Sequence, residues 1–93
     1  MYKKIELNDL LNSLKGWQAV DGREAIFKKF KLKDFGQAFA CMTKIAEKAE
    51  LMNHHPEWFN VYNNLEITLT THDAKGVTSY DKELAEFIDQ VCG

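Results

Sequence analysis

The single proline of the chain, Pro56, separates a long helical pattern from a segment with the alternation of a strand. In the helical pattern, Asp34 can cap the first turn, with Gln37 three residues later. The apolar stripe that we expect to face the core consists of Phe35, Ala38, Phe39, Met42, Ile45, Ala46 and Ala49. A proline disfavours helical backbone at the residue before it, so this helix must end before Pro56. The sequence therefore predicts a helix-to-strand junction near the middle of the chain.

Two hairpin patterns flank this helix. The expected strands cover residues 17–20, 24–32, 58–62 and 65–71, which are rich in apolar, aromatic and β-branched side chains. Asp21-Gly22 lies between the first two strands, and Asn63-Asn64 lies between the last two. All four of these turn residues tolerate positive φ, so each pair is a hairpin signal.

Helical patterns also begin and end the chain. Leucines recur at helical spacing between residues 7 and 14, and Gly16 stands where that helix would end. Thr78 to Asp81 match a capping box at the start of the last helix. We therefore expect residues 1–93 to form one α+β domain, a four-stranded antiparallel sheet with three helices packed on one face, in the order α-β-β-α-β-β-α. The other face of the sheet would stay partly open.

The chain has 93 residues and a formal net charge of −2, with scattered basic residues. This distribution gives no sign of a surface for nucleic-acid backbones. The one basic cluster, Lys28 to Lys33, is interpreted as the solvated face and end of a strand rather than a nucleic-acid site. A chain this short buries only about 60% of its unfolded surface. We therefore expect another subunit to cover part of its apolar surface.

The cysteines and the first residues bear on the location of the protein. No apolar run of signal-peptide length begins the chain, and no segment has the length and hydrophobicity to span a bilayer. Cys41 and Cys92 are far apart and lie in helical patterns. An oxidised secreted domain of this size would usually carry more cysteines. Both are therefore predicted to be reduced thiols in a cytoplasmic protein.

All three histidines lie at the ends of predicted elements. His54 and His55 are predicted at the carboxyl end of the long helix and His72 at the end of the last strand, so packing can bring these ends close together. Because histidine titrates near neutral pH, such a cluster suits proton transfer in both directions. The alternative is that His54 and His55 only cap carbonyls at the helix end, where the helix dipole favours a positive charge.

Other chemistries have less support in the sequence. Adjacent histidines have difficulty ligating one tetrahedral ion, and no HExxH or cysteine pattern assists them, so no metal is expected. There is no GxSxG elbow, and the five glycines are isolated, so no glycine-rich loop can hold a phosphate. What remains is proton chemistry that imidazoles can perform without a cofactor on a small neutral molecule.

Two acidic residues are candidates beside the histidines. Glu50 lies one helical turn before His54, and could orient that ring or simply pair with it. Asp81 is interpreted first as the reciprocal partner in its helix cap, and only second as a site residue.

Uncharged candidates complete the set. Thr70 and Thr71 precede His72, where exposed hydroxyls and backbone groups could bind a polar heterocycle. Trp17, like the other aromatic residues, is expected in the core rather than stacked on a ligand.

One pattern joins these residues: Glu50, His54-His55-Pro56, Tyr62, His72 and Asp81. At these spacings it resembles the signature of the pterin-4a-carbinolamine dehydratases. Further similar segments are Gly16-Trp17, Asp21-Gly22-Arg23, Ala25 to Lys28, Lys33 to Phe35, His54 to Asn63 and Thr71-His72. The resemblance covers nearly everything from Gly16 to Val91, and the animal members are especially similar.

The resemblance implies four antiparallel strands with three helices on one side, which agrees with the residue patterns. It also implies a hydro-lyase of tetrahydrobiopterin recycling. Such an enzyme removes water from 4a-hydroxytetrahydrobiopterin, the product that aromatic amino acid hydroxylases release, and gives quinonoid dihydropterin. The reaction protonates the departing hydroxyl and takes a proton from the pterin ring, without a metal or an organic cofactor.

By position, the resemblance implies that His54, His55 and His72 are the catalytic histidines. His54 and His72 would be the acid–base pair, and His55 would mainly bind and orient the substrate. The substrate-binding residues that it implies, at or beside the cleft, are Asn53, His54, His55, Thr70, Thr71, His72, Glu50, Trp17 and Asp81. Several relatives have an aspartate where this chain has Asn53. The amide loses the charge and gains a donor, so pterin affinity can differ, and we expect activity to be retained.

Animal relatives also stabilise the dimer of a homeodomain transcription factor, through a helical surface that otherwise forms their own tetramer. The corresponding helix here covers residues 34–50, with Gln37, Lys44 and Glu47 on its polar face. The resemblance thus implies a homodimer or homotetramer. As an alternative function it implies a non-catalytic interaction module or transcriptional coactivator, with a nuclear as well as a cytoplasmic location. The three histidines favour catalysis, because an interaction surface has no need of them; a pterin sensor is a third possibility.

Overall fold

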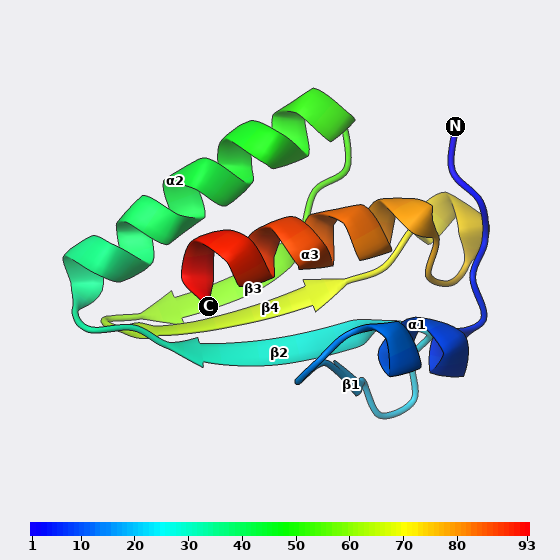
Figure 1. Ribbon diagram of the computed structural model, residues 1–93, viewed down its shortest axis with the longest axis horizontal. Helices are drawn as coiled ribbons and strands as arrows, with labels where there is room; N and C mark the ends of the chain where they lie inside the picture. The colour runs from blue at the N-terminus through cyan, green and yellow to red at the C-terminus, as the bar shows by residue number, and fades with distance from the viewer.

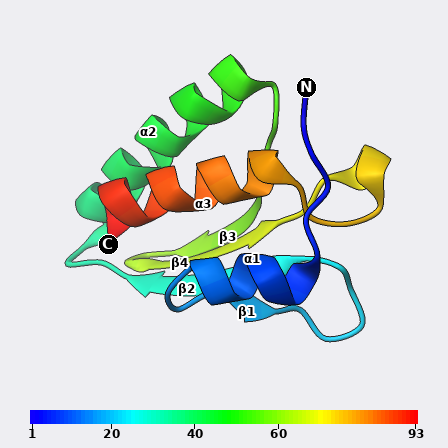
Figure 2. The same cartoon turned by 45° about the vertical axis from the view of Figure 1, so that its right-hand side comes forward.

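The computed structural model describes residues 1–93 and places three α-helices over one face of a four-stranded antiparallel sheet (Figures 1 and 2). The elements are α1 (Leu7–Ser13), β1 (Gln18–Ala19), β2 (Ile26–Lys31), α2 (Phe35–Met52), β3 (Glu57–Val61), β4 (Asn64–Leu69), the 3₁₀ turn η1 (His72–Ala74) and α3 (Ser79–Cys92). The predicted fold class and the order of helices and strands are confirmed. The 3₁₀ turn was not expected.

The strands lie in the order β1-β2-β4-β3, so β4 lies between β2 and β3. Leu65, Ile67 and Leu69 of β4 are fully buried against the helices, as the alternation predicts. The opposite face of the sheet carries no helix, and there Phe59 and Val61 of the edge strand β3 are exposed. The sheet is therefore covered on one side only.

The end of α2 explains why the chain turns at its histidines. Asn53 adopts the left-handed conformation, with φ 51° and ψ 45°. The backbone N–H of His54 donates to the carbonyl of Ala49 at 3.0 Å, and that of Asn53 donates to the carbonyl of Glu50 at 3.2 Å. These two bonds form a Schellman motif, which closes a helix with a residue that tolerates positive φ. The helix thus ends at Met52, before Pro56, as predicted.

The face that α2 buries differs from the predicted stripe. Ala38, Cys41, Ile45 and Ala49 form the buried face. Phe35 and Phe39, which were expected in the core, are 47% and 55% exposed, and their rings stack at 5.7 Å. The buried stripe is narrower because the opposite flank of α2 packs along α3, where Lys48 pairs with Glu83 at 2.8 Å. The phenylalanine flank is therefore left open in the single chain.

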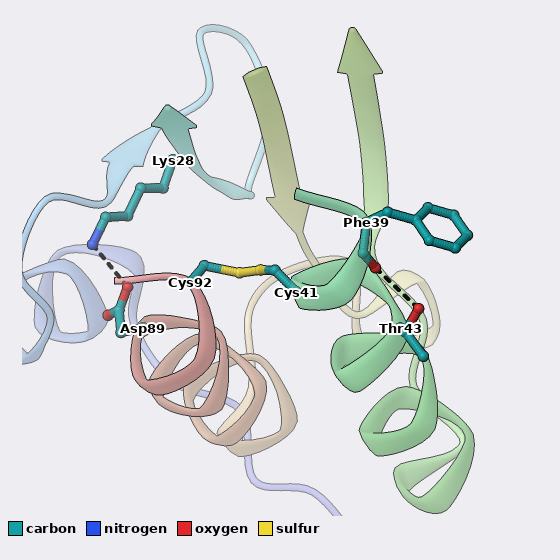
Figure 3. The surroundings of a disulfide bond; sticks show 6 residues. All are labelled: Lys28, Phe39, Cys41, Thr43, Asp89 and Cys92. Carbon is teal, nitrogen blue, oxygen red and sulfur yellow. Dashed lines mark hydrogen bonds and ion pairs between the residues drawn. A yellow bond between two sulfur atoms is a disulfide. The ribbon is translucent and has the colours of Figure 1, made fainter. Parts of the chain in front are cut away.

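The prediction of two reduced cysteines is wrong. Cys41 of α2 and Cys92 of α3 are joined as a disulfide, with 5.6 Å between their Cα atoms (Figure 3). Their separation of 51 residues gives no sequence signal for the pair, because only the packing of α2 on α3 brings them together. Phe39 points to the other side of α2, away from the disulfide (Figure 3).

The hairpin turns and strand ends also differ in detail. The second turn consists of Tyr62 and Asn63, and Tyr62, rather than the asparagines, has a positive φ of 54°. In the first turn Gly22 has the expected positive φ. β4 ends at Leu69, before the predicted boundary, so His72 lies on η1 and not on a strand. No helix is long and apolar enough to cross a membrane.

Candidate active site

The end of α2 and the end of β4 meet around an open pocket of about 370 Å³. The residues that line it are Asn53, His54, His55, Pro56, Glu57, Thr70, Thr71, His72 and Asp73, none of them hydrophobic. A pocket of this volume lies within the usual range for small-molecule sites. The structure therefore brings all three histidines to one polar cavity, together with Asn53 and both threonines.

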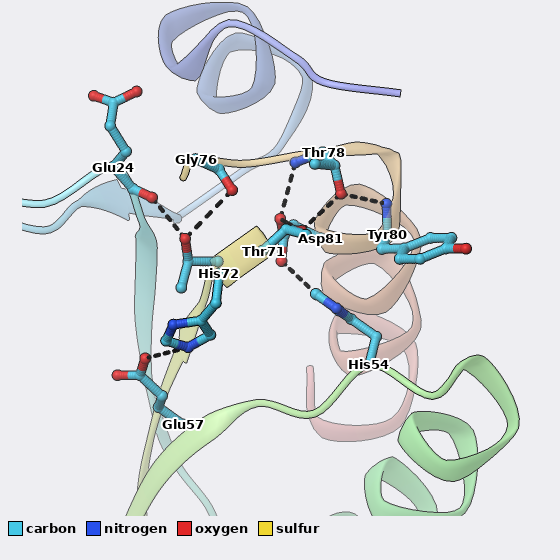
Figure 4. Close-up of polar contacts among 10 residues, drawn as sticks. Glu24, His54, Glu57, Thr71, His72, Gly76, Thr78, Tyr80 and Asp81 are labelled. Atoms are coloured by element: carbon cyan, nitrogen blue, oxygen red, sulfur yellow. Dashed lines mark hydrogen bonds and ion pairs between the residues drawn. The ribbon is translucent and has the colours of Figure 1, made fainter. Parts of the chain in front are cut away.

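His54 is the buried histidine of this cavity, with 8% of its surface exposed. Its Nε2 lies 2.7 Å from Oδ1 of Asp81, a residue of the first turn of α3 that is fully buried (Figure 4). The His54 ring also packs on Tyr80 at 5.5 Å between ring centroids. The end of α2 carries this ring, and two residues of α3 fix its orientation, although the two helices are distant in sequence.

The hydrogen bonds around Asp81 define its charge. Its Oδ2 accepts from the hydroxyl of Thr71 at 2.8 Å and from the backbone N–H of Thr78 at 2.9 Å. The Thr71 hydroxyl has one proton, which it donates to Asp81. The Thr78 hydroxyl therefore donates to Thr71 Oγ1 and accepts from the backbone N–H of Tyr80. With two donors on Oδ2, Asp81 is assigned as a carboxylate, and its Oδ1 accepts a hydrogen bond from Nε2–H of His54. The Nδ1 atom of a neutral His54 is then a free acceptor.

Asp81 therefore serves as both cap and site residue. The predicted capping box of Thr78 and Asp81 is present at the start of α3. Our first interpretation, a cap alone, omitted the contact with His54, because the capping pattern does not reveal what lies beyond the helix end. The buried carboxylate has no unsatisfied oxygen.

Glu50 contacts a different histidine from the one expected. Its carboxylate lies 2.5 Å from Nε2 of His55, and both side chains are exposed. The left-handed residue Asn53 turns the chain, so the side chain one helical turn after Glu50 no longer lies over it. His54 points inward to Asp81 and His55 outward to Glu50. Glu50 itself does not line the pocket.

The hydroxyls of Thr70 and Thr71 are already used within the protein. Thr70 Oγ1 donates to the carbonyl of Glu24 at 2.8 Å, and Thr71 Oγ1 donates to Asp81. The protons of both hydroxyls are therefore engaged within the protein in this arrangement. The two threonines instead shape the pocket wall.

His72 is the most exposed of the three histidines and lies on the turn η1 that follows Thr71. Lys75 closes this turn in the left-handed conformation, and its backbone N–H donates to the carbonyl of His72 at 3.0 Å. Nε2 of His72 lies 3.6 Å from Oε2 of Glu57. His72 thus lies on the solvent side of the pocket, whereas His54 is buried.

Sequence reasoning missed Glu57, which lines the pocket, and its partner Arg23. Both carboxylate oxygens of Glu57 accept from the guanidinium of Arg23 at 2.8 Å. These hydrogen bonds hold the pKa of Glu57 below its ordinary value; partial burial opposes the shift, and the charges of Arg23 and His72 add to it. The same contact raises the pKa of Arg23. The only sequence signal was that Glu57 follows the histidine-histidine-proline run and that Arg23 belongs to a turn.

Trp17 lies outside the pocket. Its indole N–H donates to the carboxylate of Asp89, at 3.1 and 3.3 Å to the two oxygens, and Lys28 pairs with the same carboxylate at 2.7 Å. Asp89 lies two turns beyond Asp81 on α3, roughly 12 Å along the helix axis at 1.5 Å per residue. The buried indole packs on Phe30 and joins β1 to the far end of α3. Its place is in the core, as the residue pattern suggested.

No three histidine, cysteine, aspartate or glutamate side chains are grouped so that they could hold a metal ion. Near each histidine the structure instead places one carboxylate: Asp81 at His54, Glu50 at His55 and Glu57 at His72. Each carboxylate can orient one ring and stabilise its charged form. The arrangement suits a site in which imidazoles accept and release protons.

Comparisons with known proteins show the family to which the chain belongs. Residues 2–91 match the family described as pterin 4 alpha carbinolamine dehydratase. A protein of Burkholderia vietnamiensis named as a pterin-4-alpha-carbinolamine dehydratase is 57% identical over 88% of this chain and 80% of its own length. One of Paraburkholderia xenovorans with the same name is 58% identical over 85% of this chain and 82% of its own.

Solved structures have the same fold. A transcriptional coactivator/pterin dehydratase from Brucella melitensis superimposes with a TM-score of 0.92 and 47% identity, over 98% of this chain and 99% of that one. A pterin dehydratase-like RuBisCO assembly factor of the alpha-carboxysome shares the fold at 20% identity and a TM-score of 0.71. With nearly its whole length matched and more than half of the aligned residues identical to those of named members, the chain belongs to the pterin-4a-carbinolamine dehydratase family.

Proposed function

We propose that this protein dehydrates 4a-hydroxytetrahydrobiopterin to quinonoid dihydropterin and water by histidine acid–base catalysis, and so supports tetrahydrobiopterin recycling. The observation that carries the proposal is the polar pocket at which His54, His55 and His72 converge, each with its own carboxylate. Membership of the family supplies the reaction, and the pocket supplies groups that can perform it without a cofactor.

His54 is the proposed base. The carboxylate of Asp81 holds the Nε2 proton, so Nδ1 carries the free lone pair that can take a proton from the pterin ring. The imidazolium that forms is stabilised by the buried negative charge beside it. Burial of this pair also limits competition from water.

His72 is the proposed acid. Protonated, it donates to the departing hydroxyl; the carbon–oxygen bond breaks, its electron pair leaves with water, and the pair freed by ring deprotonation forms the new double bond. The exposure of His72 supports this role, because the ring can regain its proton from solvent after each turnover. His55, held by Glu50 at the rim, is proposed to bind and orient the pterin.

The test separates binding from turnover. His54→Ala and His72→Ala should each lower kcat by about 10²-fold or more, the usual scale of acid–base catalysis. His55→Ala should mainly raise KM. The rate is followed by ultraviolet absorbance of the 4a-hydroxy intermediate, and pterin binding by quenching of protein fluorescence. A wild-type kcat in His72→Ala, with the fold intact, would remove that residue from the mechanism.

A second candidate function is a protein-interaction role. The Brucella melitensis protein is named a transcriptional coactivator as well as a pterin dehydratase. In this chain the exposed flank of α2, with Phe35 and Phe39, offers apolar surface for a helical partner or another subunit. Co-purification of a helical protein with an enzyme that shows no pterin turnover would favour this candidate.

The oligomeric state and location are part of the same proposal. We propose a homodimer or homotetramer, supported by the open apolar flank of α2 and the exposed Phe59 and Val61 of β3. A concentration-independent monomer mass in light scattering would contradict it. A cytoplasmic location is proposed by analogy with the bacterial relatives, which lend no support to a nuclear one. The cysteines no longer support it, because they are paired.

A further inference from the structure

We propose that Arg23 and Glu57 form a positioning pair for His72, which holds Nε2 of that ring and leaves Nδ1 to serve the substrate. The inference deepens the proposed dehydratase function, on which its catalytic part rests. It concerns two residues outside the histidine set: Glu57, which lines the pocket, and Arg23, which holds Glu57.

His72 needs such a partner more than the other histidines do. His54 is buried between two helices, whereas His72 lies on a 3₁₀ turn with 77% of its side chain exposed. The structure gives its ring no hydrogen bond within the protein, and its one ionic contact is with Glu57 at 3.6 Å. Without that contact nothing would select one orientation of an exposed ring. Glu57 therefore decides which nitrogen faces the pocket.

Glu57 is itself held firmly. Arg23 donates to both of its oxygens at 2.8 Å, a bidentate geometry that fixes the carboxylate plane as well as its position. Because the hydrogen bonds from Arg23 keep the pKa of Glu57 low, the carboxylate stays ionised and acts only as an acceptor. A negative charge 3.6 Å from Nε2 favours, by electrostatic attraction, the neutral ring that carries its proton on that nitrogen. Nδ1 is then the nitrogen that carries the second proton of the imidazolium, donates it as the acid, and is left with the lone pair.

The turn that carries Arg23 is anchored to the pocket wall at a second point. The hydroxyl of Thr70, which lines the pocket, donates to the carbonyl of Glu24, the residue after Arg23. The turn is also closed by the N–H of Val20, which donates to Ala25 at 3.0 Å. Arg23 therefore contacts Glu57 across the end of β4 from a turn that these hydrogen bonds hold in place. The β1–β2 turn becomes a support for His72.

Glu57→Gln is the first test variant, because the amide keeps the shape and removes the charge. Its NH₂ group can donate to Nε2, so the ring proton should move from Nε2 toward Nδ1. Nitrogen NMR of ¹⁵N-histidine-labelled protein, at a pH at which the rings are neutral, measures the proton ratio of each histidine, which is the population with the proton on Nε2 divided by the population with it on Nδ1. The ratio for His72 should fall severalfold, while that for His55, beside Glu50, should not change.

The kinetic readout is the split between kcat and KM. Glu57→Gln should lower kcat by about 10-fold to 10²-fold, the scale of a misplaced catalytic group, with KM within about 2-fold. Arg23→Lys keeps the charge but loses the bidentate fork, so its kcat should lie between wild type and Glu57→Gln. The matched control is the double variant Lys48→Gln/Glu83→Gln, which removes an exposed ion pair of the same 2.8 Å length away from the pocket. Its kcat and His72 proton ratio should equal those of wild type.

The outcomes are distinct. An unchanged His72 proton ratio in Glu57→Gln would overturn the positioning claim, whether or not the protein is a dehydratase. A shifted ratio with unchanged kcat, in an active enzyme, would overturn its catalytic part. If the wild-type protein does not accelerate dehydration, the proposed function fails, while the NMR result still decides whether the pair orients the ring. Urea unfolding of each variant confirms that the fold is retained.

Discussion

At the scale of single residues, the site is organised by carboxylates rather than by the histidines alone. Asp81 shows this most clearly. Its two oxygens accept hydrogen bonds from Thr71, from the backbone of Thr78 and from His54. One buried charge therefore caps the start of α3 and orients the His54 ring. A buried charge is costly unless it is fully hydrogen-bonded, and here it is. The stability of α3 and the chemistry of the pocket therefore depend on the same atom group.

This dual role predicts the effect of Asp81→Asn. The amide cannot accept from all these donors, so kcat should fall by about 10²-fold and the free energy of unfolding by about 1–3 kcal/mol. Asp89→Asn is the matched control on the same helix, since Asp89 binds Trp17 and Lys28 instead of a histidine. It should cost about 1 kcal/mol of stability with kcat unchanged. Equal losses of kcat in both variants would contradict a specific role of Asp81.

A second residue-scale prediction concerns pH. The pKa of Glu57 is lowered in the folded protein, so its ion pair with Arg23 stabilises the fold above the unfolded-state pKa of glutamate, about 4.3. That contribution is lost as the pH falls through the lower, folded pKa. The difference in stability between wild type and Glu57→Gln should therefore be present at pH 7 and shrink on acidification below about pH 4. Urea unfolding at a series of pH values measures it, and a difference that stayed constant would contradict the assignment.

At the scale of elements, the end of α2 is the feature that places two histidines. Asn53 occupies the left-handed position, which explains an asparagine there independently of any contact with the pterin. An aspartate at the same position would put a negative charge at the negative end of the helix dipole. The amide is thus a good solution for the backbone.

Substitutions at Asn53 test whether its left-handed backbone conformation explains the asparagine at this position. Asn53→Gly should leave the free energy of unfolding within about 0.5 kcal/mol of wild type, whereas Asn53→Ala should lower it by about 1 kcal/mol, because only glycine adopts positive φ freely. Asn53→Asp should lower it by about 0.3–1 kcal/mol through the dipole, with turnover retained. If glycine proved as destabilising as alanine in urea unfolding, the backbone explanation would be wrong.

The disulfide is the covalent link between the two long helices. Cys41 and Cys92 close a loop with a sequence separation of 51, for which the chain-entropy estimate is about 4 kcal/mol of stabilisation. Cys92→Ser, or reduction with dithiothreitol, should lower the urea midpoint accordingly, with kcat retained because the pair is remote from the pocket. Thiol titration of the unfolded, unreduced protein should find no free thiol. Two free thiols would contradict the pairing.

The elements of this fold could be predicted because their signals are local. Asp34 and Thr78 cap their helices as expected, and the alternation of Leu65, Ile67 and Leu69 fixed the buried face of β4. The exposure of Phe35 and Phe39 could not be predicted, because it depends on which flank of α2 meets α3. The disulfide depends on the same packing.

At the scale of the whole molecule, the strand order β1-β2-β4-β3 builds the site. It places the end of β4 between the β1–β2 turn and the start of β3, so Arg23 meets Glu57 although 34 residues separate them. The three histidines were recognisable from sequence by their residue type and by resemblance. Arg23 and Glu57 were not, because an exposed turn residue and a strand residue carry no signal of their pairing. Long-range topology, rather than local pattern, completes the pocket.

The most direct measurement is the rate at which the purified protein removes the 4a-hydroxy intermediate, generated in place and followed by ultraviolet absorbance. It is made in the presence of a chelator, with wild type and the double variant His54→Ala/His72→Ala at equal concentration. We expect wild type to accelerate the loss well beyond the uncatalysed rate, and the double variant to lose at least about 10²-fold of that rate while retaining its fold. An uncatalysed rate with wild type, or equal rates for the two proteins, would contradict the account.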